Sequence, residues 1–223
     1  MKQSEIEKVM EATFKTAIKP TAWKKVGGFL YCRKEKLFFT LIILGIGKTE
    51  RIHYSLDYKY SEFDDLFWPI VQLPENAKRP LSFRAQGAWV FPSFRVYEGE
   101  LPNADWEARH LEMVVGGLLA DANRRSSEMA ERIGTPDQNL EQLEKLFAEH
   151  MEKHPGSLVD INREKVMTAI LKEDIALAKR IVRERIDRND SGGFGIGGKT
   201  FYQLADEYLA AHSLFGGEGT SGS

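Results

Sequence analysis

Residues 37–60 read LFFTLIILGIGKTERIHYSLDYKY, and this stretch decides the predicted fold. Residues 37–44 are apolar at almost every position, which is typical of a strand covered on both faces. From Arg51 to Tyr60 apolar and polar residues alternate, as in a strand with one buried and one solvent face. Between them, residues 45–49 predict a turn in which glycine supplies a positive φ. We therefore expect an antiparallel hairpin that nucleates a sheet.

The segments around this hairpin extend the predicted sheet. Residues 6–17 carry apolar side chains three and four apart, which predicts a helix that ends before Pro20. Residues 23–33 predict a short hairpin, with Gly27 and Gly28 at its turn. Ser61 is a candidate N-cap of a short helix through residue 67.

Two further strands are predicted at residues 81–84 and 88–97. Pro92 lies in the second of them, and because proline cannot donate to a ladder, an edge position or a bulge is expected. Residues 1–102 are therefore predicted to be a helix packed on an antiparallel sheet.

From Asn103 onward the pattern is helical. Asn103 is a candidate N-cap for a long helix, and Gly116 and Gly117 in its middle each cost about 1 kcal/mol relative to alanine. Either the helix bends there or a neighbour packs against the bare backbone. Thr135 and Pro136 provide the strongest helix-start signal of the chain.

Residues 160–187 fit either one helix or two, and a last helix follows residue 200. Residues 216–223 are rich in glycine and serine and predict a flexible tail. The predicted fold class is α+β, with a sheet region at 1–102, a helical region at 103–215 and the tail at 216–223.

Length, composition and charge limit the classes of protein to which the chain can belong. The chain has 223 residues, 42% of them hydrophobic and 29% charged, which is ordinary for a globular protein. It has no apolar run of the roughly 18 residues that span a bilayer, so we expect no membrane association. The single cysteine, Cys32, cannot form an internal disulfide and predicts a cytoplasmic location. A net charge of −2 implies no global attraction to nucleic acid.

Residues 193–200 match the phosphate-loop pattern G-x-x-x-x-G-K-[ST] letter for letter. In such a loop backbone N–H groups wrap the phosphates, the lysine neutralises them and the threonine holds magnesium. Gly193, Gly198, Lys199 and Thr200 are therefore candidate cofactor-binding residues. The pattern also needs a buried strand before it, whereas residues 180–190 are charged and helix-patterned, so a plain glycine linker is the competing interpretation.

Three smaller patterns are candidates for functional sites. His150 and His154 lie four apart, the spacing of two zinc ligands on a helix, but no third ligand can be named, and solvated histidines are favoured. Asp57 and Lys59 share a strand face, and such a pair occurs in metal-dependent nucleases. The competing interpretation, which the alternation favours, is an ordinary charged solvent face. Cys32 is interpreted as a small buried hydrophobe rather than a nucleophile.

Nucleic acid is a further partner hypothesis. Aromatic residues such as Trp23 and Trp89 lie near basic residues such as Lys24 in residues 1–100, and this mixture can stack on single strands. Core packing of a sheet explains most of these aromatics without a ligand. This partner is therefore not favoured.

Residues 1–100 resemble a bacterial family of uncharacterised domains found near toxin–immunity and defence loci. The resemblance rests on a first helix that ends at Pro20, on residues 23–33 (WKKVGGFLYCR) and on the apolar strand after them. It implies an α+β fold and a bacterial setting, and carries no catalytic residues.

Because no complete catalytic set is visible, we expect no catalytic residues, metal or cofactor. The expected function is that of a cytoplasmic protein that binds another protein, as an immunity or defence component. The alternative is a phosphate- or nucleotide-binding enzyme that uses residues 193–200.

Overall fold

The computed structural model describes residues 1–87, 89–157 and 159–215. The fold is α+β, as predicted, with an antiparallel sheet, an N-terminal helix and a mostly helical C-terminal region. The chain forms two compact units. The sheet unit comprises residues 1–61 and 80–135, and the helical unit comprises residues 62–79 and 136–223. The tail predicted at 216–223 lies outside the described residues.

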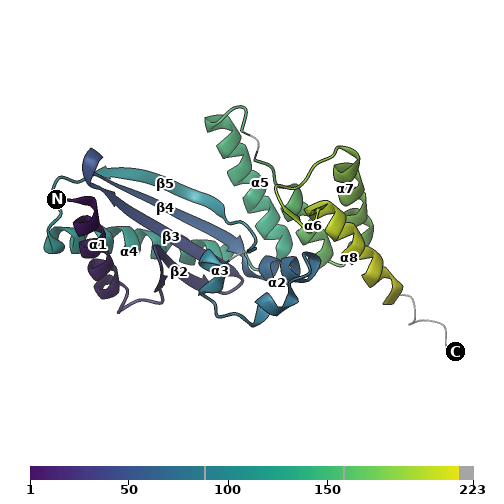
Figure 1. The fold of residues 1–223 in the computed structure, drawn as a ribbon, viewed down its shortest axis with the longest axis horizontal. Coiled ribbons are helices and arrows are strands. Elements are labelled where there is room, and N and C mark those ends of the chain that lie inside the picture. The colour runs from purple at the N-terminus through teal and green to yellow at the C-terminus, as the bar shows by residue number, and fades with distance from the viewer. Residues whose placement is uncertain (88, 158, 216–223) are drawn as a thin grey trace. The chain divides into compact units, whose positions relative to one another are not determined.

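The sheet has five antiparallel strands in sequence order (Figure 1). Every connection in it joins neighbouring strands, so the sheet is a meander. The strands are β1 (Lys24–Val26), β2 (Phe29–Lys34), β3 (Leu37–Ile46), β4 (Arg51–Tyr60) and β5 (Phe94–Pro102).

The predicted central hairpin is confirmed as β3 and β4, which pair along ten residues from Leu37↔Tyr60 to Ile46↔Arg51. The turn differs from the prediction, because the positive φ of 51° belongs to Glu50 and not to a glycine. A short 3₁₀ helix, η1 (Gly47–Thr49), forms the turn. Gly45 serves close packing instead, since a Cβ there would lie 2.6 Å from the Trp106 ring.

One face of the sheet is covered by α1 (Gln3–Ala17) and α4 (Ala108–Arg132), as Figure 1 shows. Strand periodicity sends the odd-numbered residues of β3 to this face, and Leu37, Phe39 and Leu41 are fully buried there. Burying such side chains contributes about 1.5–3 kcal/mol each. The predicted packing of the first helix on the sheet is confirmed.

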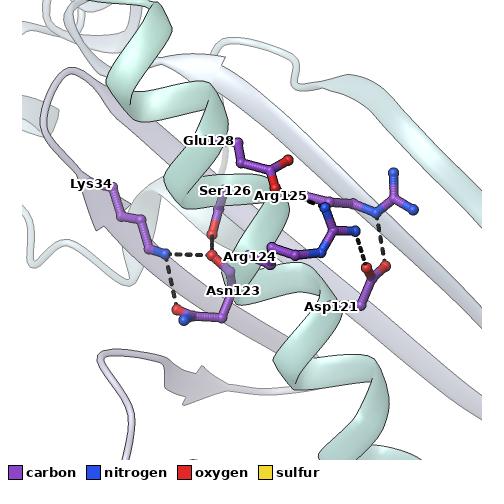
Figure 2. Close-up of polar contacts among 7 residues, drawn as sticks. All are labelled: Lys34, Asp121, Asn123, Arg124, Arg125, Ser126 and Glu128. Carbon is purple, nitrogen blue, oxygen red and sulfur yellow. Dashed lines mark hydrogen bonds and ion pairs between the residues drawn. The ribbon is translucent and has the colours of Figure 1, made fainter.

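A polar contact holds α4 against β2 (Figure 2). The Lys34 ammonium donates to the backbone oxygen and Oδ1 of Asn123, both at 2.9 Å. It also donates to Ser127 Oγ at 2.7 Å. Burial lowers the pKa of Lys34, and three acceptors satisfy its three donors.

Within the described residues of the sheet unit, the opposite face is covered at one end only. There residues 80–87 and 89–93 contact β4, because the Arg84 and Phe91 backbone oxygens accept from the Lys59 ammonium, and Phe38 and Phe91 are buried. This segment corrects two strand predictions. Residues 83–86 form a short helix, α3 (Phe83–Gln86), and residues 89–93 lie outside any strand, so that β5 begins at Phe94; residue 88 is not described.

The start of the long helix also differs from the prediction. Helix α4 begins at Ala108 with Glu107 as its N-cap residue. Asn103 is buried before it, where Nδ2 donates to the Asp105 backbone oxygen at 2.7 Å and Oδ1 contacts His110 Nε2 at 2.9 Å. The helix continues through Gly116 and Gly117, and a Cβ at either glycine would meet nothing within 4 Å in the described chain. Of the two alternatives, a closely packed neighbour is therefore not found among the described residues.

The helical unit contains the remaining elements. Helix α5 begins at Pro136, as predicted, and the 160–187 pattern proves to be two helices separated at Glu173, whose φ is +60°. Its elements are α2 (Ser61–Ile70), which starts at the unit boundary, η2 (Pro74–Lys78), α5 (Pro136–Lys153), α6 (Asn162–Leu171), α7 (Ile175–Asp187), β6 (Gly195–Ile196), β7 (Lys199–Thr200) and α8 (Phe201–Phe215). Among the described residues, no helix is both long and apolar enough to span a bilayer.

Candidate functional site

The uncovered half of the sheet forms a groove of about 510 Å³ over β3, β4 and β5. Its walls combine apolar side chains from β3 with charged side chains from β4 and β5. We call it the open-face groove; its lining residues are Ile42, Leu44, His53, Tyr54, Ser55, Arg95, Glu98, Gly99 and Glu100.

The apolar wall comes from β3. Even-numbered residues of this strand point away from α1 and α4, so Ile42 and Leu44 face the groove. Leu44 is 51% exposed, one of the few large hydrophobic side chains left in solvent. Together with Ile42 it gives the groove an apolar side.

The opposite wall contains two groups of ion pairs. Glu100 accepts from Arg51 Nη1 at 3.1 Å through one oxygen and contacts His53 Nδ1 at 2.9 Å through the other. Arg95 pairs with Asp57 and with Glu98. Burial raises the pKa of Asp57, and Arg95 opposes that rise. The groove therefore has an apolar side and a charged side whose members are paired with each other.

Asp57 and Lys59 share a strand face, as predicted, but Lys59 does not lie in solvent. It is 3% exposed, and its ammonium donates to the backbone oxygens of Arg84 at 2.9 Å and Phe91 at 3.0 Å. The expectation of an ordinary solvent face is wrong at this end of β4, because residues 80–93 cover it. Within the described residues, no cluster of three or more His, Cys, Asp or Glu side chains could hold a metal ion.

The glycine-rich residues 193–200 form a tight hairpin. Strands β6 and β7 pair through Gly195↔Thr200 and Ile196↔Lys199, and Gly197 and Gly198 occupy the turn with φ of 59° and 79°. Positive φ at both turn positions is the requirement of a type I′ hairpin, which accounts for these two glycines. The element before the loop is helix α7 rather than a buried strand.

The predicted cofactor-binding side chains of this hairpin contact α8. Thr200 Oγ1 accepts from the Gln203 N–H at 3.3 Å, and Gln203 Oε1 accepts from the Thr200 N–H at 2.9 Å, which is a capping box. Lys199 Nζ pairs with both carboxylate oxygens of Glu207, at 2.7 and 2.8 Å. Gly193 lies outside the hairpin strands with a φ of 64°. These contacts give the motif a structural role, while phosphate binding by Gly193, Gly198, Lys199 and Thr200 stays a prediction.

The remaining sequence candidates are placed as follows. His150 and His154 lie with their ring centroids 4.8 Å apart, and His150 Nε2 contacts Ser157 Oγ at 3.1 Å. Cys32 is buried, as predicted, and burial raises the pKa of its thiol to about 12. A thiol with so high a pKa is not a thiolate at neutral pH, so its reactivity is low.

Charged residues also gather on α4, but they form intrahelical pairs (Figure 2). Asp121 accepts from Arg124 at 2.6 Å and from Arg125 at 2.8 Å, and Arg124 also pairs with Glu128 at 2.8 Å. Such i,i+3 and i,i+4 pairs stabilise a helix by a few tenths of a kcal/mol each.

Sequence reasoning placed Arg51, His53 and Asp57 on one face but missed the β5 side of the groove. Glu98 and Glu100 fell outside the strand predicted at 88–97. The alternation of residues 97–101, Tyr-Glu-Gly-Glu-Leu, carries the strand signal that would have found them.

No family model matches the chain, and neither a curated protein nor a solved structure matches it.

Proposed function

We propose that this chain is a non-enzymatic protein that binds another protein through the open-face groove. The observation that carries the proposal is the exposed Leu44 side chain, next to Ile42 and opposite a wall of paired charges. Protein interfaces commonly combine an apolar centre with a polar rim, and a few central apolar residues supply most of the affinity.

Contacts of the chemically capable side chains support a non-enzymatic role. The Lys59 ammonium is buried on two backbone oxygens, and Lys199 is paired with Glu207. The Cys32 thiol is buried and protonated at neutral pH. In each case the reactive group is engaged in the fold rather than presented to a substrate.

The finer assignment is an immunity or defence component of the bacterial cytoplasm. It is supported by the resemblance of residues 1–100 to domains found near toxin–immunity loci. The single buried thiol fits a reducing compartment.

Isolation of the partner from the native host, followed by calorimetric titration of the two purified proteins, tests the proposal. Leu44→Lys places a charge on the apolar side of the groove and should weaken binding by at least about tenfold. Met113→Lys is the matched control, because Met113 is an exposed hydrophobic residue on α4, 67% accessible. Met113→Lys should bind as the wild type does, and wild-type affinity in Leu44→Lys would overturn the proposal.

A further inference from the structure

Strand β5 closes the sheet on one side, and only its inner edge is paired. It pairs with β4 from Tyr58↔Phe94 to Arg51↔Pro102 and is last in the strand order (Figure 1). Within residues 1–87, 89–157 and 159–215, no strand pairs with its outer edge. An open strand edge is a template for a strand of another chain.

The backbone of β5 shows which groups this edge offers. The Asn103 N–H donates to the Glu50 backbone oxygen at 2.7 Å, so residue 103 faces the β4 side. Because direction alternates along a strand, Glu98 and Glu100 turn their N–H and C=O groups outward. Pro102 has the same outward direction, where its missing N–H removes no ladder bond.

A side chain satisfies the outward backbone groups of a comparable stretch of β3, whereas those of β5 have no such contact in the described chain. Beyond the end of β2, the Gln3 side chain donates to the Gly45 backbone oxygen at 2.9 Å and accepts from the Gly47 N–H at 3.2 Å. Within the described chain, nothing equivalent contacts the outward backbone of Glu98 or Glu100. Strand β5 therefore keeps free donors and acceptors.

The open stretch is regular enough to receive a strand. A register shift lies between Leu56 and Asp57, opposite residues 95–97, and beyond it the pairing runs without interruption to Pro102. At about 3.4 Å per residue, residues 97–101 extend roughly 17 Å, the length of an ordinary short strand.

The charges on β5 indicate what kind of segment could pair with its outer edge. Glu98 and Glu100 lie two apart on the open face of the sheet, and their side chains are exposed. An antiparallel second copy centred on Gly99 would set Glu98 opposite Glu100, and like charges in that position are destabilising. Lysine or arginine at alternate positions of an added strand would face both glutamates. The present contacts of the two glutamates with Arg51, His53 and Arg95 are partly exposed, so rearranging them costs little.

We infer that the outer edge of β5, at residues 97–101, takes an extended basic segment of the partner as a sixth strand; this inference rests on the proposed function.

Amide hydrogen exchange, measured by NMR on the ¹⁵N-labelled full chain, tests it with two synthetic peptides. In one, lysine alternates with threonine and valine; in the other, glutamate replaces every lysine. The basic peptide should slow exchange of the Glu98 and Glu100 amides by at least about tenfold at saturation, and the acidic peptide should not. The double variant Glu98→Lys/Glu100→Lys should reverse this preference. Unchanged exchange at both amides, or equal slowing by both peptides, overturns the inference.

A second comparison separates this inference from the proposed function. Glu98→Pro removes an outward N–H at an edge position that tolerates proline, whereas Glu98→Gln keeps the N–H and removes the charge. If Leu44→Lys abolishes partner binding while Glu98→Pro retains wild-type affinity, strand addition fails and the proposed function stands. If Leu44→Lys retains wild-type affinity, the proposed function fails.

Discussion

The sheet unit and the helical unit treat their buried polar groups differently. In the described part of the sheet unit, the Lys59 ammonium has two backbone acceptors and Ser61 Oγ donates to the Lys36 oxygen at 2.8 Å, although Trp23 Nε1 and the Tyr97 hydroxyl are buried without a hydrogen-bond partner. In the helical unit, the Asn139 amide, one Glu164 carboxyl oxygen and the Tyr202 hydroxyl are buried without hydrogen-bond partners. A buried polar group without a partner costs about 1–3 kcal/mol.

This difference indicates which substitutions should destabilise and which should stabilise. Removing the Lys59 ammonium from the sheet unit breaks its contacts with Arg84 and Phe91. Removing one from the helical unit eliminates an uncompensated cost. The hydrogen bonds of the Lys59 ammonium involve none of the residues that line the open-face groove.

The largest expected effect is that of Lys59→Met. It removes the hydrogen bonds to the Arg84 and Phe91 backbone oxygens, and bonds to charged groups contribute about 1.5–3 kcal/mol each. We expect a loss of about 3 kcal/mol in the free energy of unfolding, measured by urea titration at pH 7. Lys24→Met, at an exposed position of β1, is the control and should change stability by less than about 0.5 kcal/mol. A similar small loss in both variants would contradict the pairing argument.

Glu164→Gln should have the opposite sign, with a pH dependence. Glu164 is 5% exposed, and burial raises its pKa from 4.5 to about 7. The unfolded chain loses this proton from about pH 4.5 and the folded chain from about pH 7, so wild-type stability falls as pH rises between those values. At pH 8 the variant should be about 3 kcal/mol more stable than the wild type, and near pH 4 equally stable.

The control for this prediction is Glu152→Gln, at an exposed position of α5, which should show no such pH dependence. If Glu164→Gln and the wild type differ in unfolding free energy by the same amount across pH 4–8, the buried Glu164 carboxylate is not what destabilises the protein at high pH.

Substituting asparagine by leucine should have opposite effects in the two units. Asn139 is 0% exposed and neither its Oδ1 nor its Nδ2 has a partner, so Asn139→Leu should stabilise the protein by about 1–2 kcal/mol. Asn123 Oδ1 accepts from Lys34, so Asn123→Leu should destabilise by about 0.5–1 kcal/mol. Thermal unfolding of the two variants checks the signs, and equal signs would remove the contrast between the units.

The smallest expected effect is that of Lys199→Ala. Its exposed ion pair with Glu207 should contribute less than about 0.5 kcal/mol to stability. Titration with ATP and magnesium examines the alternative function of residues 193–200. If the protein works by binding another protein, this titration should give no saturable signal. Tight ATP binding that disappears in Lys199→Ala would instead favour the nucleotide-binding enzyme.

Much of the fold follows from local sequence pattern. The apolar run of β3 and the alternation of β4 determine two strands and their faces, and Pro136 determines the start of α5. Predictions failed where tertiary contacts override local preference. Residues 81–84 have a strand-like composition but turn into α3 over the end of the sheet, and Asn103 is buried by contacts with Asp105 and His110 instead of capping a helix.

The candidate site was less predictable than the fold. Alternation places His53, Asp57 and Lys59 on one face, but it does not show that residues 80–93 bury one end of that face. Leu44 was recognisable as a strand residue, yet its exposure depends on where that covering segment ends. A local pattern therefore identified the face and could not locate its open half.

Hydrogen–deuterium exchange of the chain alone and in complex with its partner tests the central claim most directly. We predict slower exchange in peptides that contain residues 42–46 of β3 and 97–101 of β5, with little change in α4. Protection confined to residues 193–200 or to α4, with β3 and β5 unchanged, would contradict binding through the open-face groove.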